Sequence, residues 1–235
     1  MFPGTDSPTM RLMASQTWFA RLPLATQAHI LGSVFHITGK KGELMLPANV
    51  PVQGWYAVLT GLVKLQSVPV KGCCATFLGV ACGDWFGEGS ALNAETRRYE
   101  VVAMRDSELL CLPQAEFDHL FATCIEFNQF LVKQMNLRVK QAMAVVEATR
   151  VRSPEQRVAL SLSPLFWNQS RKLNLSQDEL ASLVGISRQT TNRALKSLAQ
   201  RGLVSLEFGR VDIPDHNALT AFIFSTPEPQ EPSTG

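Results

Sequence analysis

The amino-acid sequence predicts an α+β fold in which a strand-rich N-terminal domain is joined by a long helix to a C-terminal helix-turn-helix domain. Short apolar runs broken by glycines come first, a stretch without glycine or proline follows, and two short capped helices come next. These patterns are typical of strands, of one long helix and of a compact helical domain, in that order. The predicted boundaries are 1–15 for a flexible N-terminus, 16–113 for the strand-rich domain, 114–149 for the long helix, 150–226 for the C-terminal domain and 227–235 for a flexible tail.

The composition is that of a folded protein, since 46% of the 235 residues are hydrophobic and 18% are charged. No apolar run approaches the roughly 20 residues that a membrane-spanning helix needs, and the N-terminus lacks the layout of a signal peptide. We therefore expect a cytoplasmic protein without a membrane partner. Residues 171–210 hold seven basic against three acidic side chains, an excess of +4. This local excess is compatible with a polyanionic partner.

The strand-rich region contains apolar runs of strand length, among them "GWYAVLTGLVKLQSV" and "CCATFLGVACGDWFGEGS". Gly-Leu and Gly-Asp steps between these runs predict turns, and the close spacing favours an antiparallel sandwich or barrel. A short helix is expected before the strands, at residues 17–31.

The cysteines show no paired metal-ligand spacing, which favours free thiols in a reducing compartment. Adjacent Cys73 and Cys74 would be candidates for oxidant sensing if one were exposed, but only Lys71 is near enough in sequence to favour a thiolate. Burial in the strand-rich domain is therefore the favoured interpretation. The five residues are Cys73, Cys74, Cys82, Cys111 and Cys124.

The stretch from 114 to 149 predicts a helix of about 36 residues, roughly 54 Å long at 1.5 Å per residue, which is too long to lie on one small domain. In its second half, apolar side chains alternate spacings of three and four, the pattern of a heptad seam with β-branched residues at one position. This pattern indicates a dimerisation helix. A long core helix remains the alternative, because three heptads are a short sample. The predicted dimer contacts are Val132, Met135, Val139, Ala142 and Val146.

Helix-start signals mark the C-terminal domain. Ser153 can cap a first helix, and Ser176 with Glu179 three residues later forms the capping box of a second. Gly185 suits the tight turn that ends this second helix, and Ser187 can cap the next one. The run "LVSLEFGRVDI" then reads as two short strands about a Gly-Arg turn. The result is a helix-turn-helix followed by a hairpin.

The helix after Ser187 has two distinct faces at helical spacing. The apolar face, which should pack on the preceding helix, is formed by Thr191, Ala194, Leu195 and Leu198. The polar face is formed by Gln189, Asn192, Arg193 and Lys196, with Arg188 in the first turn. Arginine matches guanine O6 and N7, and glutamine or asparagine matches adenine N6 and N7. A solvated helix face is the ordinary alternative, but the two caps, the glycine turn and the hairpin together favour DNA binding.

These segments resemble the Crp/Fnr family of bacterial regulators, typified by the cyclic-AMP receptor protein and the fumarate and nitrate reduction regulator. "GWYAVLTGLVKL" and "GDWFGEGSAL" are similar to the family's β-roll strands, "PQAEFDHL" to the entry of its dimer helix, and "LSQDELASLVGISRQTTNRALKSLAQRGLV" to its winged helix-turn-helix. The resemblance implies an N-terminal β-roll (a double-stranded β-helix of the cyclic-nucleotide-binding type) and a C-terminal winged helix. It also implies a homodimer on a palindromic double-stranded DNA site, with RNA polymerase as a further candidate partner.

The resemblance assigns roles to residues of the helix-turn-helix. It implies that Arg188, Gln189 and Arg193 read bases, and the contact set extends to the neighbouring Ser187, Asn192 and Lys196. Ser176, Gln177, Thr190 and Arg210 are expected near phosphates. Cyclic-AMP-type members carry glutamate at the position of Gln189, and glutamate accepts from cytosine N4 whereas glutamine suits adenine. The sequence therefore predicts a half-site that differs at that base pair.

The resemblance also implies a ligand site, in which Gly87 and Glu88 match the pair that holds ribose and Arg98 matches the arginine that holds the cyclic phosphate. The residue after this arginine is the bulky Tyr99 where the family places serine or threonine. Farther on, Ala142 and Met143 replace the Thr-Ser pair that contacts adenine. Losing these polar groups disfavours cyclic-nucleotide binding. The alternative is a β-roll turn with a structurally paired carboxylate, and the effector stays open.

No catalytic or metal-ligating residues are predicted. The sequence lacks a glycine-rich phosphate loop, a nucleophile elbow and a paired acid–base motif. Iron–sulfur members of the resembled family carry an N-terminal cysteine cluster, whereas no cysteine precedes Cys73 here, so such a cluster is not expected. We expect the histidines, which show no ligand spacing, to be packing or surface residues: His29, His36, His119 and His216. The remaining alternative to DNA binding is a winged helix that docks on protein.

Overall fold

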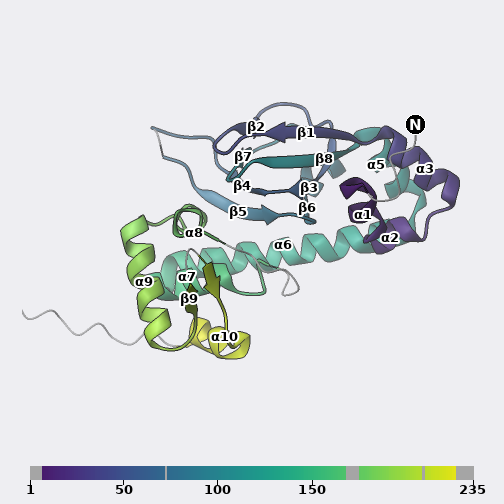
Figure 1. Cartoon of the computed structure of the whole chain (residues 1–235). Helices are drawn as coiled ribbons and strands as arrows, with labels where there is room; N and C mark the ends of the chain where they lie inside the picture. Colours follow the sequence, from purple (N-terminus) through teal and green to yellow (C-terminus); the bar gives the residue numbers. More distant parts are fainter. Residues whose placement is uncertain (1–6, 72, 168–174, 208–209, 226–235) are drawn as a thin grey trace, which may run out of the picture. The chain divides into compact units, whose positions relative to one another are not determined.

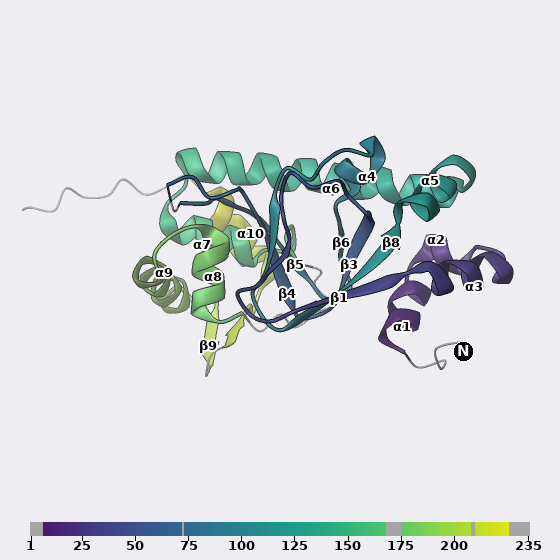
Figure 2. The same ribbon diagram turned by 90° about the horizontal axis from the view of Figure 1, so that it is seen from above.

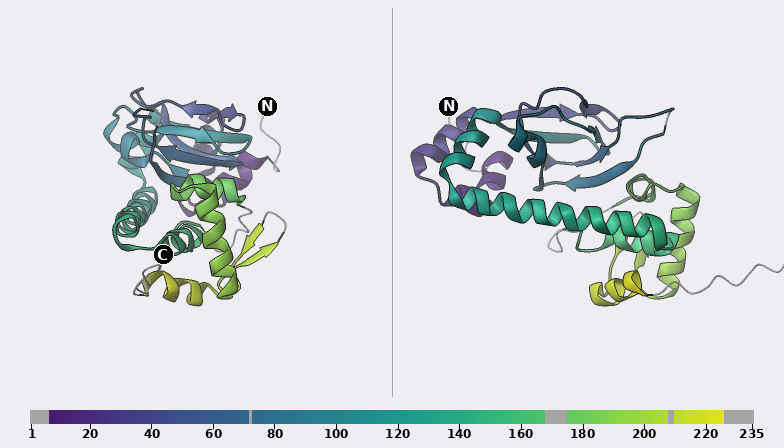
Figure 3. Two further views of the ribbon diagram at one scale, coloured as in Figure 1. Left: turned by 90° about the vertical axis from the view of Figure 1, so that its left-hand side faces the viewer. Right: turned by 180° about the vertical axis from the view of Figure 1, so that it is seen from behind.

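The computed structural model describes residues 7–71, 73–167, 175–207 and 210–225, without the side chains of Glu207 and Arg210. It divides into two compact units, Met1–Arg138 and Val139–Gly235. The division falls inside helix α6 (Ile125–Val151), which Figure 3 shows as one continuous helix.

The first unit is built around two four-stranded antiparallel sheets (Figure 1). One has the order β1-β8-β3-β6 and the other β2-β7-β4-β5, and Figure 2 shows β3, β6 and β8 in one layer with β4 and β5 in the other. This pair of sheets confirms the predicted β-roll. The strands are β1 (Phe35–Gly39), β2 (Leu44–Leu46), β3 (Gly54–Thr60), β4 (Leu62–Gln66), β5 (Thr76–Ala81), β6 (Trp85–Phe86), β7 (Glu100–Ala103) and β8 (Ser107–Pro113).

Glycines make the two turns that the sequence predicted. Gly61 joins β3 to β4 with φ of 88°, and Gly83 lies between β5 and β6 with φ of 86°. This left-handed region strains residues with a side chain. The space at Gly61 is also closed, because an added Cβ would lie 2.2 Å from the Ser107 Oγ. Both the backbone and the packing therefore require glycine at this turn.

An aromatic core joins the helices of this unit to the β-roll. Trp55 of β3 stacks on Trp85 of β6 with 4.1 Å between ring centroids, and Trp18 meets Phe127 edge to face at 5.0 Å. All four side chains are almost completely buried. Figure 3 shows the contributing helices gathered at the amino-terminal end of α6. They are α1 (Pro8–Ala14), α2 (Thr17–Ala20), α3 (Leu24–Ser33) and α5 (Gln114–Thr123).

This core explains three departures from the sequence-based expectations. Residues 8–14, expected to be flexible, form α1, which Ser7 caps and which buries Met13. The helix expected at residues 17–31 is two helices separated around Pro23. The helix expected at 114–149 is interrupted at Cys124, whose backbone is extended, so α5 and α6 are separate. The break lets Phe117 of α5 and Phe127 of α6 enter the same core, a gain that propensity alone does not reveal.

The second unit is a helix-turn-helix domain with a hairpin and a C-terminal helix. Strands β9 and β10 pair antiparallel, which confirms the predicted hairpin, while its turn at 208–209 lies outside the described residues. Buried leucines from several helices, among them Leu160, Leu195 and Leu219, form its interior. The elements are α7 (Pro154–Leu162), α8 (Gln177–Val184), α9 (Arg188–Gln200), β9 (Ser205–Glu207), β10 (Arg210–Asp212) and α10 (His216–Phe224).

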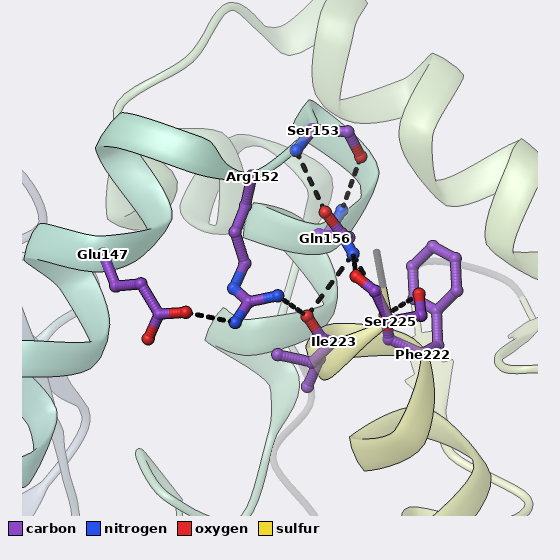
Figure 4. Close-up of polar contacts among 7 residues, drawn as sticks. All are labelled: Glu147, Arg152, Ser153, Gln156, Phe222, Ile223 and Ser225. Carbon is purple, nitrogen blue, oxygen red and sulfur yellow. Dashed lines mark hydrogen bonds and ion pairs between the residues drawn. The ribbon is translucent and has the colours of Figure 1, made fainter. Parts of the chain in front are cut away.

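Helix α10 was not expected from the sequence, and two side chains near the start of α7 hold its carboxyl end (Figure 4). The Arg152 guanidinium donates to the Ile223 carbonyl, pairs with the Glu147 carboxylate and lies 5.0 Å from the Phe224 ring centroid. The Gln156 amide donates to the Phe222 carbonyl at 3.2 Å. These bonds satisfy carbonyls that a helix end leaves without intrahelical partners.

Candidate DNA-binding surface and sensor site

The caps predicted for the helix-turn-helix are present. Glu179 N donates to Ser176 Oγ at 3.2 Å, and Ser176 N donates to Glu179 Oε2 at 2.7 Å, which completes the capping box. Gly185 ends α8 with φ of 71°. Ser187 Oγ then accepts from Thr190 N at 3.1 Å and caps α9. The turn between α8 and α9 is therefore specified locally by hydrogen bonds and one glycine.

The two predicted faces of α9 differ in burial as expected. Thr191, Ala194, Leu195 and Leu198 are at most 1% exposed. The Thr191 hydroxyl is satisfied by donating to the Ser187 carbonyl at 3.1 Å. On the other face Gln189, Arg193 and Lys196 are exposed, and Arg188 is exposed at the first position of the helix. The structure thus presents two cations and one amide on one solvent-facing surface, with a third cation at the start of the helix.

Asn192 differs from the other polar residues of α9. It is only partly exposed, and its Oδ1 is buried without a hydrogen-bond partner among the described residues. Helical spacing predicted that Asn192 lies on the same face as Gln189 and Arg193. In the structure it lies at the border of the two faces, and part of its amide points inward. Asn192 is therefore less available to a ligand than its neighbours.

The expected phosphate contacts gather at helix amino termini, where free backbone N–H groups and the helix dipole favour anions. Ser176 caps α8 and Gln177 is its first residue, while Ser187 and Thr190 lie at the start of α9. The Ser187 and Thr190 hydroxyls are 2.8 Å apart and share a hydrogen bond. Arg210 begins β10, but its side chain lies outside the described part of the structure.

The β-roll turn that contains Gly87 and Glu88 forms the start of α4 (Glu88–Asn93). Gly87 is left-handed, with φ of 92°, and Glu88 is buried. The Glu88 Oε1 lies 3.2 Å from the Nε of Arg138 in α6, and Arg138 Nη2 also donates to the Trp85 carbonyl at 2.6 Å. This is the structurally paired carboxylate that the sequence left as the alternative to a ligand contact.

Arg98 does not join this turn. Its side chain is 81% exposed and lies 3.4 Å from the Glu95 carboxylate. Its neighbour Arg97 is 2% exposed instead, with its guanidinium carbon 5.1 Å from the Tyr56 ring centroid. Arg97 donates to the Pro47 carbonyl at 3.1 Å, while its Nη2 has no hydrogen-bond partner among the described residues. By its separation from Gly87 and Glu88, Arg98 matched the arginine that holds the cyclic phosphate in the family. The structure shows that Arg97, and not Arg98, points inward.

Tyr99 occupies the space beside Gly87. A Cβ added to Gly87 would lie 3.6 Å from the Tyr99 hydroxyl. Burial, followed by the Glu88 carboxylate, raises the pKa of Tyr99 from 10.0 to about 12. The hydroxyl therefore stays neutral at physiological pH and adds no charge to this turn.

The cysteines correct one expectation. Cys73, Cys74 and Cys82 are exposed, while Cys111 is buried and Cys124 is partly buried. Burial raises the pKa of Cys111 from 9.0 to about 12, and a hydrogen bond with Tyr56 opposes this increase. Cys73 and Cys74 lie in the connection between β4 and β5, outside the strands, so they are not covered by the other sheet. Among the described residues, no group of three or more His, Cys, Asp or Glu side chains is arranged to hold a metal ion.

The predicted seam of α6 is exposed in the single chain. Val132, Val139 and Val146 are 66%, 56% and 54% exposed, and Met135 is 43% exposed. Ala142 is exposed as well. One heptad earlier, Ile125 is 64% exposed, which extends the row of β-branched residues at every seventh position. Among the described helices, even α6 lacks the apolar length that a membrane span requires.

Two family models match the chain, the cyclic nucleotide-binding domain over residues 37–124 and the Crp-like helix-turn-helix domain over residues 156–222. The chain is 30% identical over 173 residues to a cyclic AMP receptor protein from Thermus thermophilus, covering 73% of this chain and 80% of that protein. It is 29% identical to the transcriptional regulator SdrP of the same organism, covering 78% and 91%.

Solved structures show the same fold. FixK2 from Bradyrhizobium japonicum matches with a TM-score of 0.68 and 18% identity, covering 80% of this chain and 96% of that one. A transcriptional regulator of the CRP/FNR family from Thermus thermophilus matches with a TM-score of 0.59 and 25% identity, covering 82% and 100%. A β-roll of the cyclic-nucleotide-binding type and a capped helix-turn-helix define a transcription regulator with a sensor domain and a DNA-binding domain. The chain belongs to the Crp/Fnr family of such regulators.

Proposed function

We propose that the protein binds a palindromic operator as a homodimer and reads it with α9. The observation that carries this proposal is the exposed surface of α9, where Gln189 and Arg193 lie opposite the side chains that pack α9 into its domain and Arg188 is exposed at the first position of the helix. A helix held in this way by a second helix can enter a major groove with its amino-terminal residues toward the bases. The amino termini of α8 and α9 supply hydroxyls and N–H groups for the flanking phosphates.

Alanine substitutions in α9 test this proposal. We expect Arg188→Ala and Arg193→Ala each to cost roughly 1–3 kcal/mol and to relax specificity at one base position. Sites selected from random DNA by the wild-type protein supply the operator, and titrations with single-base variants of that operator measure the loss. The control is Gln200→Ala, which truncates an exposed side chain at the far end of α9. If both arginine variants bind every site like wild type, α9 is not the reading helix.

Dimerisation through α6 is supported by its exposed seam. In a two-stranded coiled coil, β-branched residues at one seam position favour dimers, and Val132, Val139 and Val146 occupy that position. Such a dimer would place two α9 helices about one DNA turn, roughly 34 Å, apart on a two-fold symmetric site.

We propose that the β-roll does not bind a cyclic nucleotide. Arg98 is turned to solvent and Tyr99 stands beside Gly87, so the expected cradle for a cyclic phosphate lacks both of its side chains. Glu88 is engaged in an ion pair within the chain. Calorimetric titration with cyclic AMP and cyclic GMP tests this point, and we expect no heat of binding. Binding at micromolar concentration would overturn it.

We infer that the protein is a non-catalytic regulator that acts in the cytoplasm, where DNA and the transcription machinery are found. RNA polymerase is a candidate partner because a regulator bound beside a promoter can contact it. Co-sedimentation of the two proteins on a selected operator, compared with each protein alone, tests for this contact.

A further inference from the structure

Arg188 is the first residue of α9, and its guanidinium is already paired in the absence of DNA. Its Nε lies 3.0 Å from Oδ1 of Asp178, which belongs to the first turn of α8. The two side chains are 66% and 61% exposed. An ion pair this exposed adds little to folding stability, because water screens it and both side chains lose freedom. The consequence of the pair is therefore expected in DNA recognition and not in folding.

We propose that Asp178 is a positioning residue that aims the Arg188 guanidinium at a guanine in the operator. The inference rests on the proposed function, in which Arg188 reads a base. An arginine binds guanine through two parallel N–H groups directed at O6 and N7. Asp178 engages the Nε side of the fork, and the two Nη groups have no partner among the residues that the structure describes, so both are available for this contact. Arginine has several rotatable bonds, so a side chain that is held in place beforehand loses less freedom when it binds.

The charge of Asp178 separates specific from non-specific binding. A carboxylate near the DNA repels phosphates, which weakens binding to any sequence. The same carboxylate favours the one arrangement in which Arg188 meets guanine. Asp178 is thus expected to increase discrimination between bases while it lowers affinity for unrelated DNA.

The substitution Asp178→Asn tests the proposal in the full-length protein. The base pair read by Arg188 is first identified as the position where Arg188→Ala loses discrimination. Discrimination is then measured as the ratio of affinities for the selected operator and for the operator changed at that pair. We expect Asp178→Asn to lower this ratio about three- to tenfold. The decrease is smaller than the full discrimination that a bidentate arginine–guanine contact provides, because Arg188 is still present. Affinity for unrelated DNA should be unchanged or higher.

Two controls isolate the effect. Glu155→Gln removes a carboxylate from the first turn of α7 in the same unit, and it should leave the ratio unchanged. In the double variant Asp178→Asn with Arg188→Ala, the ratio should equal that of Arg188→Ala alone, because Asp178 acts through Arg188. A merely structural role of Asp178 would instead lower affinity for all sequences and add to the arginine variant.

The outcomes are distinguishable. If Arg188→Ala loses discrimination while Asp178→Asn retains the wild-type ratio, the positioning role is wrong and the proposed function stands. If Arg188→Ala keeps wild-type discrimination at every base pair, the reading role of Arg188 fails, and the role of Asp178 fails with it. Thermal unfolding of each variant shows whether it is folded, and the exposed pair predicts melting temperatures close to wild type.

Discussion

Gln189 is exposed in the first turn of α9, directly after Arg188. Its amide can donate and accept at once, which matches adenine N6 and N7, whereas a carboxylate can only accept and matches the N4 amine of cytosine. The identity of this single side chain is therefore expected to set one base pair in each half of the operator.

We expect Gln189→Glu to shift the preferred base pair at that position from one containing adenine to one that offers a cytosine amine. Parallel selection of bound DNA by wild type and variant measures the change. Gln200→Glu, which makes the same substitution at an exposed residue at the far end of α9, is the control and should keep the wild-type site. Identical sites for wild type and Gln189→Glu would contradict the assignment.

The buried thiol of Cys111 is expected to make the stability of the fold depend on pH in the alkaline range. Because burial raises its pKa from 9.0 to about 12, the folded state keeps the thiol protonated where the unfolded chain ionises it. The stability that this thiol contributes is fully present below pH 9 and is lost as the pH rises toward about 12. We expect Cys111→Ala to reduce the slope of unfolding free energy against pH in this range, measured by urea denaturation. Val58→Ala, which truncates a buried side chain that does not titrate, should lower the stability without changing the slope.

At the scale of single elements, the sequence pattern of α6 predicted one of its features and missed another. Its heptad spacing predicted the exposed row of valines, and this row is exposed in the chain. The amino-terminal limit of the helix was not predictable, since nothing around Cys124 is a helix breaker. The break follows from the burial of Phe117 and Phe127 in one core, which depends on the β-roll beneath them.

Substitution in the seam of α6 tests its role in dimerisation. We expect Val139→Glu to raise the dimer dissociation constant at least about tenfold, because it removes apolar burial and opposes two like charges. The single chain should still fold, since Val139 is 56% exposed. Sedimentation over a range of concentrations measures the equilibrium. Lys140→Glu places the same residue at the adjacent exposed position, and a similar loss there would argue against the seam.

Helix α10 depends on a contact that lies 71 residues away in sequence. Removing the guanidinium in Arg152→Ala leaves the Ile223 carbonyl without this donor, and we expect a loss of roughly 1–3 kcal/mol in unfolding free energy. Hydrogen exchange should increase first in α10, while the amides of α9 stay protected. Arg150→Ala, at an exposed arginine on α6, is the matched control. Equal exchange in both variants would show that Arg152 does not hold α10.

For the whole molecule, DNA binding and protein binding are distinguished by how strongly the affinity depends on salt concentration. Contacts from lysine and arginine to phosphates release counterions, so the affinity for DNA should fall by a factor of about ten or more between 50 and 200 mM salt. Gel shifts on a selected operator at several salt concentrations measure this slope. A flat dependence would favour the alternative in which the winged helix binds protein.

The sequence by itself determined the local parts of this protein. Capping boxes, the glycine turn and the two faces of α9 depend on residues at most seven positions apart, so spacing and side-chain chemistry were sufficient to predict them. The succession of a strand-rich domain, a long helix and a helix-turn-helix was also predictable, because strand and helix periodicities differ. The resemblance to the Crp/Fnr family identified the strand-rich domain as a β-roll.

Only the tertiary structure decided features that join distant segments. It placed Arg97 inside the β-roll and Arg98 outside, paired Glu88 with Arg138, and brought Asp178 to Arg188. It also made α1 part of an aromatic core. In each case the local sequence allows several orientations of the side chain. Burial and charge pairing with residues that the fold brings near select one of them.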